Sequence, residues 1–108
     1  MLKKVNRLAK ARDIEKAFAR GRTFFNSFFT VKFAPSALGH RFTVVVSTKV
    51  FKQAVKRNRL KRIIREYIRK NLVIFKQGDY LVMTKPKISK LPENQLVLSF
   101  LEVVGKIK

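Results

Sequence analysis

The chain has 108 residues, of which 46% are hydrophobic, and its 26 Lys and Arg against 6 Asp and Glu give a formal net charge of +20. This length and apolar content predict one folded domain over residues 1–108, and the charge favours RNA, DNA or an anionic membrane surface as the partner. The lack of Cys excludes disulfides and thiolate metal sites. The sequence shows neither an apolar run long enough to span a membrane nor a cleavable leader, so we expect a cytoplasmic protein.

The first twenty residues predict a short basic arm followed by a helix. Residues 1–8 are basic and lack clear periodicity, which indicates either an arm that orders only against a partner or a frayed terminus. Residues 9–20 are rich in Ala, Lys, Arg and Glu, and Gly21 supplies a stop just past their end. Ile14 and Phe18 share one face of this helix, where they either enter the core or line a shallow groove.

Residues 23–33 and 41–47 predict two strands, which we expect to pair as a hairpin across the turn residues Pro35, Ser36 and Gly39. A period of two places Phe25, Phe29, Val31 and Phe33 on one face of the first strand, and Phe24, Asn26, Phe28, Thr30 and Lys32 on the other. The second face mixes aromatic, polar and basic side chains. Such a face suits base stacking and phosphate contact, although a half-exposed antiparallel sheet has the same pattern.

Residues 56–70, which read KRNRLKRIIREYIRK, have the strongest pattern in the chain. Eight of these fifteen residues are Lys or Arg, and only Glu66 is acidic. A helical rotation places Leu60, Ile63, Ile64, Tyr67 and Ile68 within an arc of about 140°. The opposite side gathers Asn58, Lys61, Arg62, Arg65 and Arg69, with Arg59 and Lys70 at its edge. Guanidinium groups bind two phosphate oxygens at once, so this side favours a nucleic-acid interface over a solvated helix face, which usually mixes both signs of charge.

The rest of the chain predicts one more strand and one more helix. Residues 80–84 form a buried type of strand, and a strand–helix–strand order predicts that they pair in parallel with residues 41–47, with a right-handed crossover by default. Pro92 and Glu93 open a last helix that ends at Gly105. The residues of that helix predicted to face the core are Leu96, Val97, Phe100, Leu101 and Val104. The element order is α-β-β-α-β-α in one compact α/β layer.

The chemistry-bearing residues do not form a catalytic set. The six acids are scattered over different elements, and His40 is a lone loop histidine. The sequence has no metal-ligand spacing, no Ser/His/Asp arrangement and no glycine-rich phosphate loop. We therefore predict that the polypeptide carries no catalytic residues and that any catalysis belongs to a partner.

The stretch Ala54 to Glu66, AVKRNRLKRIIRE, closely resembles the RNR signature of the protein subunit of bacterial ribonuclease P. The resemblance extends along most of the chain, through Lys4, Arg7-Leu8, Asp13-Ile14, Phe18, Gly21, Arg41, Val46-Ser47, Lys49 and Asp79. The sequence departs from the family pattern at three places. Ile14 stands where Phe is usual, an aromatic residue is common near Lys32, and residues 50–53 replace a shorter Gly-containing link.

The resemblance implies an α/β sandwich with a left-handed crossover, in place of the right-handed default, and assembly with a catalytic RNA. In that family the RNA uses Mg²⁺ to cut the 5′ leader from precursor tRNA. Carried over, the contacts to the catalytic RNA are Arg57, Asn58, Arg59, Lys61, Arg62 and Arg65, and the same helix face adds Arg69. A cleft between the first helix and the open sheet face would hold the single-stranded leader. Its lining is predicted to be Ile14, Phe18, Thr30 and Lys32, with Phe28 added from the same strand face.

Mg²⁺ is expected to be bound mainly by the partner RNA, and neither a protein-bound metal nor a protein partner is expected. The alternative is a ribosomal protein or a general RNA chaperone without leader specificity. A duplex-DNA binder fits less well, because the basic helix needs its apolar side for the core and the sequence lacks a helix-turn-helix pattern. The same apolar requirement disfavours a membrane-surface helix.

Overall fold

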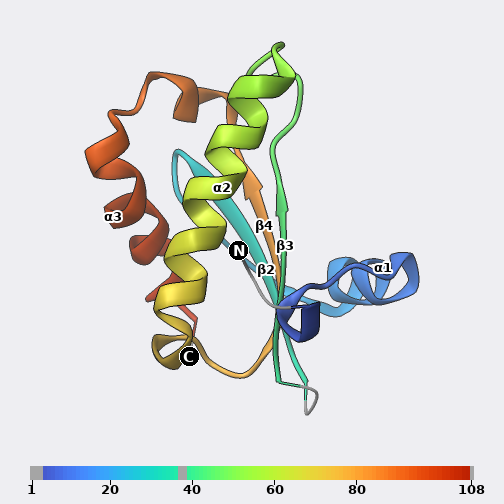
Figure 1. Ribbon diagram of the computed structural model, residues 1–108. Coiled ribbons are helices and arrows are strands. Elements are labelled where there is room, and N and C mark those ends of the chain that lie inside the picture. The colour runs from blue at the N-terminus through green and yellow to red at the C-terminus, as the bar shows by residue number, and fades with distance from the viewer. Residues whose placement is uncertain (1–3, 37–38, 108) are drawn as a thin grey trace.

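A mixed sheet of four strands lies between two unequal helical layers in the computed structural model, which describes residues 4–36 and 39–107 (Figure 1). The described elements are α1 (Ala11–Arg20), β1 (Arg22–Phe25), β2 (Phe29–Pro35), β3 (His40–Val45), α2 (Ala54–Lys70), β4 (Gly78–Thr84) and α3 (Glu93–Val104), with 3-10 turns at Lys4–Asn6, Leu72–Ile74 and Pro86–Lys90. Helices α2 and α3 cover one face of the sheet. Helix α1 packs against one end of the other face, whose remainder carries no helix (Figure 1).

The strand order is β1-β2-β4-β3, so β4 lies between the two strands that precede it in sequence. The predicted parallel pairing of β3 with β4 is confirmed. The predicted hairpin of β2 with β3 is wrong, because both strands pair with β4 instead. Tyr80, Leu81 and Val82 are each at most 4% exposed, so both faces of β4 are apolar and buried. A strand of this kind belongs in the centre of a sheet, where its two edges also find partners.

The predicted single strand over residues 23–33 is divided by a turn. The side-chain carbonyl of Asn26 accepts hydrogen bonds from the backbone N–H groups of Phe28 (2.9 Å) and Phe29 (2.8 Å), which is how Asn stabilises tight turns. β1 then folds back on β2, with Phe24 opposite Val31 and Phe25 opposite Thr30. Paired residues share a face, so Phe24 joins the core side while Phe25 joins the open side. The sequence pattern placed both on the wrong faces.

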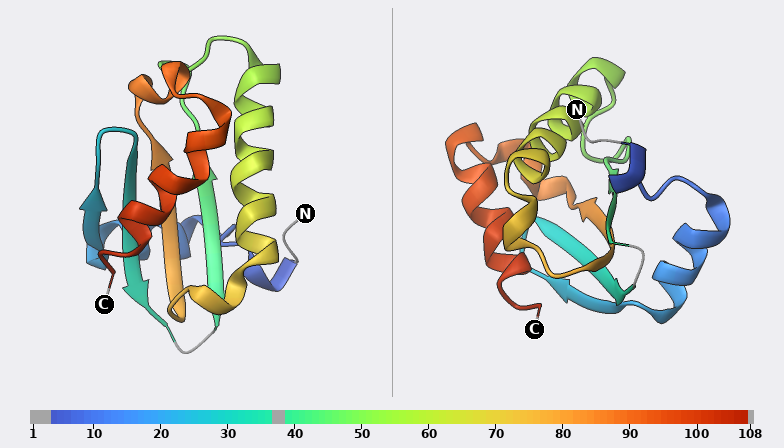
Figure 2. Two further views of the ribbon diagram at one scale, coloured as in Figure 1. Left: turned by 90° about the vertical axis from the view of Figure 1, so that its left-hand side faces the viewer. Right: turned by 60° about the horizontal axis from the view of Figure 1, so that its bottom comes forward.

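The connection from β3 through α2 to β4 is left-handed, as the family resemblance implied. In the left view of Figure 2 both strands run upward, α2 lies on the viewer's side of the sheet, and the chain moves from β3 leftward to β4. The connection between parallel strands of one sheet is normally right-handed. The unusual hand allows α2 to cover β3 at one side of the sheet, beside α3.

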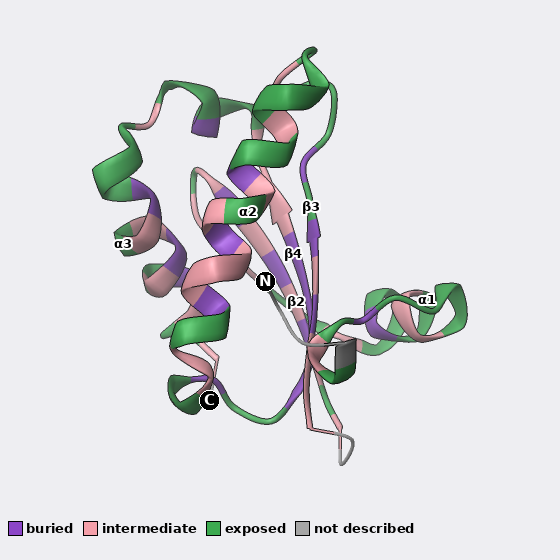
Figure 3. Cartoon of the chain, viewed as in Figure 1, coloured by how far each residue is buried: buried purple, intermediate pink, exposed green. Residues whose placement is uncertain are grey.

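The core lies between the sheet and the two covering helices (Figure 3). Leu60, Ile64 and Ile68 are the buried residues of α2, which confirms the predicted inner face of that helix. Helix α3 buries Leu96 and Phe100, as predicted, together with Val103; its other predicted core positions, which are Val97, Leu101 and Val104, are only half-buried. Aromatic rings link the layers, with Phe29 and Phe100 centred 5.4 Å apart.

The described part of the basic arm packs along β3. The backbone N–H of Leu8 donates to Phe42 O at 2.9 Å, and the Thr43 hydroxyl donates to Leu8 O. Leu8 is only 2% exposed, and the Asn6 amide donates to His40 O at 2.8 Å. Residues 4–8 are therefore ordered by the chain itself and not only by a partner, whereas residues 1–3 of the predicted arm lie outside the described residues.

Candidate nucleic-acid interface

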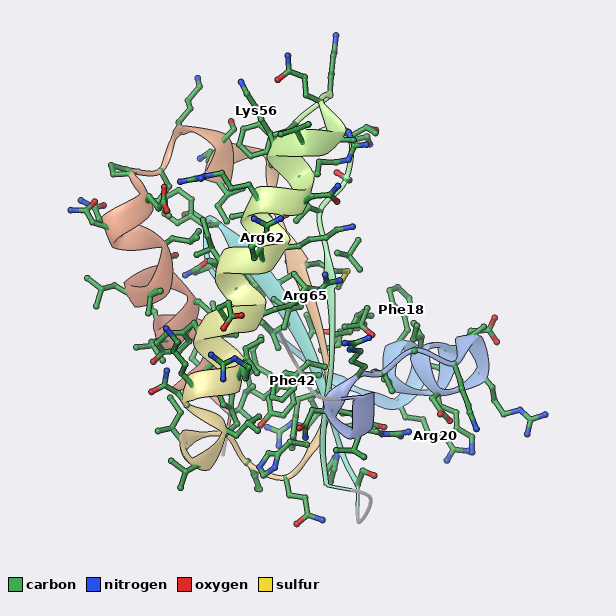
Figure 4. The ribbon with its side chains drawn as sticks, in the orientation of Figure 1. Phe18, Arg20, Phe42, Lys56, Arg62 and Arg65 are labelled. Atoms are coloured by element: carbon green, nitrogen blue, oxygen red, sulfur yellow. The ribbon has the colours of Figure 1, made fainter. Side chains whose placement is uncertain are left out.

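The outward side of α2 carries a set of polar and cationic residues that we call the α2 stripe. Its members are Asn58, Lys61, Arg62, Arg65 and Arg69. The helix forms here because residues 54–70 contain neither Gly nor Pro and repeat their apolar residues at helical spacing. Asn58, Arg62 and Arg69 are exposed, while Lys61 and Arg65 are half-buried. The predicted outer face is therefore confirmed as a geometric arrangement (Figure 4).

Three of the arginines predicted to contact RNA have partners within the chain. Arg57 donates from Nη1 to Phe51 O (2.9 Å) and Lys52 O (2.7 Å), and it thereby fixes the loop that enters α2. Arg59 pairs with Glu93 at 3.1 Å and Arg69 with Glu66 at 2.8 Å. These two pairs are exposed, and such pairs contribute only about 0–1 kcal/mol, so a phosphate can compete for either guanidinium. Among the described residues, Lys61, Arg62 and Arg65 form no ion pair.

The second region is the uncovered part of the sheet, which we call the open face. The strand registers place on it Thr23, Phe25, Thr30, Lys32, Thr43, Val45 and Met83. Helix α1 stands at one end of this face and contributes Phe18, which is 54% exposed. Lys32 Nζ lies 4.5 Å from the centre of the Phe18 ring. Phe18 is therefore exposed where α1 meets the open face, and the sequence alternative that it enters the core is excluded. We keep the name cleft for this corner, formed by Ile14 and Phe18 of α1 with Thr30 and Lys32 of β2.

The structure brings four of the five predicted cleft residues together but not the fifth. Thr30 and Lys32 are half-exposed on β2, and Ile14 is half-buried one helical turn before Phe18. Phe28 instead packs against the hydrophobic core and, with Leu98 of α3, lines a hollow on the other side of the sheet. It lies there because the Asn26 turn interrupts the alternation that had grouped it with Thr30. Phe28 is thus removed from the cleft.

Arg41 fixes the position of α1 relative to the sheet. Its guanidinium donates from Nε and Nη2 to the two oxygens of Asp79, both at 2.8 Å, and from Nη1 to Asp13 at 3.1 Å. The hydrogen bonds to Asp79 raise the pKa of Arg41 above its usual value, so the group stays charged. Asp13 belongs to α1, Arg41 to β3 and Asp79 to β4. This triad therefore holds α1 against the two strands at the end of the open face.

Gly21 makes the close turn from α1 into β1 possible. A side-chain carbon at this position would lie 2.3 Å from Ala17 O and 3.3 Å from the Cβ of Lys32. Any larger residue would clash with the last turn of α1 and crowd the Cβ of Lys32. The glycine predicted as a helix stop therefore also allows α1 to pass directly into β1 beside Lys32.

The α2 stripe and the cleft meet at the β3 edge. A hollow of about 340 Å³ lies between them, lined by Arg7 and Leu8 of the N-terminal segment, Ile14 of α1, Thr43 of β3 and Arg65 of α2, among others. Figure 4 shows Arg65 on the side of α2 nearest β3, with Phe18 beyond that strand. The two regions therefore form one continuous surface. The sequence offered no signal for this junction, because its residues come from four separate segments.

The described residues contain no cluster of three or more His, Asp or Glu side chains that could hold a metal ion. Asp13 and Asp79 both bind the Arg41 guanidinium, which already neutralises their charge. The His40 ring nitrogen Nε2 lies 2.7 Å from Phe75 O and so joins β3 to the segment before β4. Within 4–36 and 39–107, no helix is both long and apolar enough to cross a membrane.

Together these features define a small basic α+β protein, in which an arginine-rich helix borders a half-open sheet. Residues 2–108 match the family model described as Ribonuclease P. The chain belongs to the family of ribonuclease P protein components, as its resemblance to the RNR signature predicted.

Curated relatives and solved structures agree with this assignment. The chain is 35% identical over 101 residues to the ribonuclease P protein component of Finegoldia magna, covering 93% of this chain and 88% of the relative. It is 33% identical over 92 residues to that of Nitrosococcus oceani, covering 84% and 77%. The RNase P protein of Staphylococcus aureus superposes with a TM-score of 0.88 at 26% identity over 95% of both chains. The protein from Thermotoga maritima gives 0.84 at 29% identity, covering 94% and 97%.

Proposed function

We propose that this protein is the subunit of ribonuclease P that binds the catalytic RNA through the α2 stripe and the 5′ leader of precursor tRNA through the cleft. The observation that carries the proposal is the continuity of the two regions across the β3 edge, in a chain of this family. Arg62 and Arg65 offer guanidinium groups to phosphates on one side. On the other side, Phe18 and Lys32 offer an aromatic ring and an ammonium group to unpaired nucleotides.

The two regions act at different steps in this proposal. The α2 stripe neutralises crowded phosphates and releases their counterions, which contributes affinity without regard to sequence. The cleft contacts the leader, which mature tRNA lacks. Binding energy that is present for the substrate and absent for the product favours precursor over product, so the protein acts on selectivity and leaves the chemistry to the RNA.

The cleavage itself is assigned to the RNA partner. Bound Mg²⁺ would supply charge stabilisation at the reacting phosphate and activation of water. The described acids do not form an oxygen cage for this ion, because Asp13 and Asp79 are held by Arg41. In this proposal Mg²⁺ is bound mainly by the RNA, and the polypeptide contributes Lys and Arg side chains that stabilise the assembly at low Mg²⁺.

Reconstitution with a ribonuclease P RNA and a precursor tRNA at near-physiological Mg²⁺ tests the proposal. The protein should stimulate removal of the leader. Phe18→Ala and Lys32→Ala should each weaken precursor binding by about 5- to 10-fold, with mature tRNA binding unchanged. Lys87→Ala, at an exposed lysine of the 3-10 turn Pro86–Lys90, is the matched control and should change neither.

Two results would contradict the proposal. Equal losses of affinity for precursor and mature tRNA would remove the leader-binding role of the cleft. If the protein bound RNA but did not stimulate cleavage, a ribosomal protein or a general RNA chaperone would be the better assignment.

A further inference from the structure

A second exposed phenylalanine lies on the open face, on the part that α1 leaves uncovered. Phe25 ends β1 and stands opposite Thr30, so it shares the face of Thr30 and Lys32. Its exposed fraction is 59%, against 54% for Phe18. Its neighbour Phe24 packs against the core, so exposure is particular to Phe25 and not a property of the whole strand. A ring kept in water on a binding face is available to a ligand.

Two lysines converge on Phe25. Lys85 Nζ lies 4.8 Å from the centre of the ring and donates to Asn26 O at 2.6 Å. Lys106 Nζ donates to the backbone carbonyl of Phe25 at 2.8 Å. Glu102 is the acid at this turn, with its Oε1 3.5 Å from the Asn26 amide nitrogen, which also bonds to Ser99 of α3. The end of β1 therefore presents an aromatic ring beside two ammonium groups.

This arrangement repeats the one at Phe18, where Lys32 Nζ lies 4.5 Å from the ring centre. The two sites are separate. Thr30 and Lys32 are two residues apart on β2, and β1 lies one strand away, so the Cα atoms of Phe25 and Lys32 are about 8 Å apart by strand geometry. Successive stacked nucleotides rise by about 3.4 Å, so a separation of this size corresponds to about two nucleotide steps and suits neighbouring nucleotides of one strand.

Resting on the leader-binding role proposed above, we infer that Phe25 and Lys85 form a second nucleobase-binding site. It takes an unpaired nucleotide of the leader while Phe18 and Lys32 take another. The base stacks on the Phe25 ring, and the ammonium groups of Lys85 and Lys106 contact the adjacent phosphates. Stacking tolerates every base because each has a π-face, so the second site extends the length of leader that is bound without adding sequence preference.

The test measures affinity of the reconstituted holoenzyme for precursor tRNAs whose leaders are lengthened one nucleotide at a time. Wild-type affinity should rise in two steps. Phe25→Leu, which keeps an apolar side chain and removes the ring, should abolish one step, a loss of about tenfold with long leaders. Phe18→Leu should abolish the other step. Phe25→Tyr keeps the ring and should keep both steps, and Leu98→Ala, at a residue of α3 that is 67% exposed, controls for the loss of exposed apolar surface.

A fluorescent base reports the stacking directly. 2-Aminopurine placed in turn at each leader position should be quenched at two positions by the wild-type protein and at one by Phe25→Leu. If wild-type affinity does not depend on leader length, the leader-binding role itself fails. If wild type shows that dependence and Phe25→Leu shows the same two steps and the same quenching, only the second site is overturned.

Discussion

The α2 stripe and the cleft differ in how the chain builds them. The stripe comes from twelve consecutive residues of a single helix, residues 58–69, and its geometry follows from the helical repeat alone. The cleft combines residues of α1 and β2, with further open-face residues from β1, β3 and β4. A local pattern therefore suffices to build the surface that we propose for phosphate binding. The surface that we propose for the leader requires the whole topology.

Arginine serves a different purpose in each region. Arg62 and Arg65 extend from α2 without an ion-pair partner among the described residues. Arg41 is turned inward, with a side chain that is 16% exposed and bonds to two carboxylates. Two of the six acids, Asp13 and Asp79, are thus used to hold α1 against the sheet, and Arg62 and Arg65 remain available to a polyanion.

Removal of Arg41 should have the largest effect, because it should disturb the cleft and spare the α2 stripe. Arg41→Met leaves Asp13 and Asp79 close together without their cation, which should lower the free energy of unfolding by about 3 kcal/mol. Discrimination between precursor and mature tRNA should fall as α1 loses its position, while the α2 stripe is retained. Urea unfolding and parallel binding assays measure the two effects. Arg20→Met, at an exposed arginine of α1, is the control and should change stability by less than about 0.5 kcal/mol.

Removal of two stripe arginines should produce the opposite pattern. Arg62→Ala combined with Arg65→Ala should weaken assembly with the catalytic RNA on the order of 100-fold, because each phosphate contact by a charged donor contributes roughly 1.5 kcal/mol. The preference for precursor over mature tRNA should persist once the complex is saturated. A filter-binding titration followed by competition measures both quantities. Loss of the preference with unchanged assembly would show that the roles of the two regions are exchanged.

Salt dependence should also separate the α2 stripe from the cleft. If the α2 stripe and its neighbours meet six to eight phosphates, the logarithm of the affinity for the catalytic RNA should fall with the logarithm of salt at a slope of about −4 to −7. The double variant at Arg62 and Arg65 should reduce that slope by about two, since each lost phosphate contact removes roughly one. Phe18→Ala should leave it unchanged, because stacking releases no counterions. A flat wild-type dependence would contradict the charge argument.

The smallest effect is expected at the exposed pair of Arg59 and Glu93. Glu93→Gln should lower the free energy of unfolding by less than about 1 kcal/mol, since both side chains are more than half exposed. Freed from its acid, Arg59 should bind the catalytic RNA slightly more tightly, by a few-fold at low salt. Thermal unfolding and RNA titration of the same variant test this. A large loss of stability would mean that the pair holds α2 against α3.

The sequence predicted well those features that depend on neighbouring residues. The inner and outer faces of α2 were correct because one helix defines them, and the parallel pairing of β3 with β4 followed from the element order. The faces of Phe25 and Phe28 were wrong, because the Asn26 side chain creates a turn within what reads as one continuous aromatic strand. Asn26 followed by Ser27 was the available signal for that turn.

Long-range contacts account for the remaining differences. The apolar run of residues 80–84 indicated a buried strand but not its two neighbours, so the insertion of β4 between β2 and β3 was missed. The Arg41 triad joins residues 28 and 38 positions apart. The resemblance marked Arg41 and Asp79 as family residues but did not indicate that they bind each other.

The central place of β4 has a consequence for synthesis of the protein on the ribosome. The hairpin of β1 and β2 can form early, whereas β3 has no strand partner until residues 78–84 leave the exit tunnel. Closure of the sheet therefore waits for a contact between distant segments, which is slow compared with helix formation. The arginine-rich helix α2 leaves the ribosome before β4 can complete the open face, so the surface proposed for the leader is the later of the two to form as the chain is made.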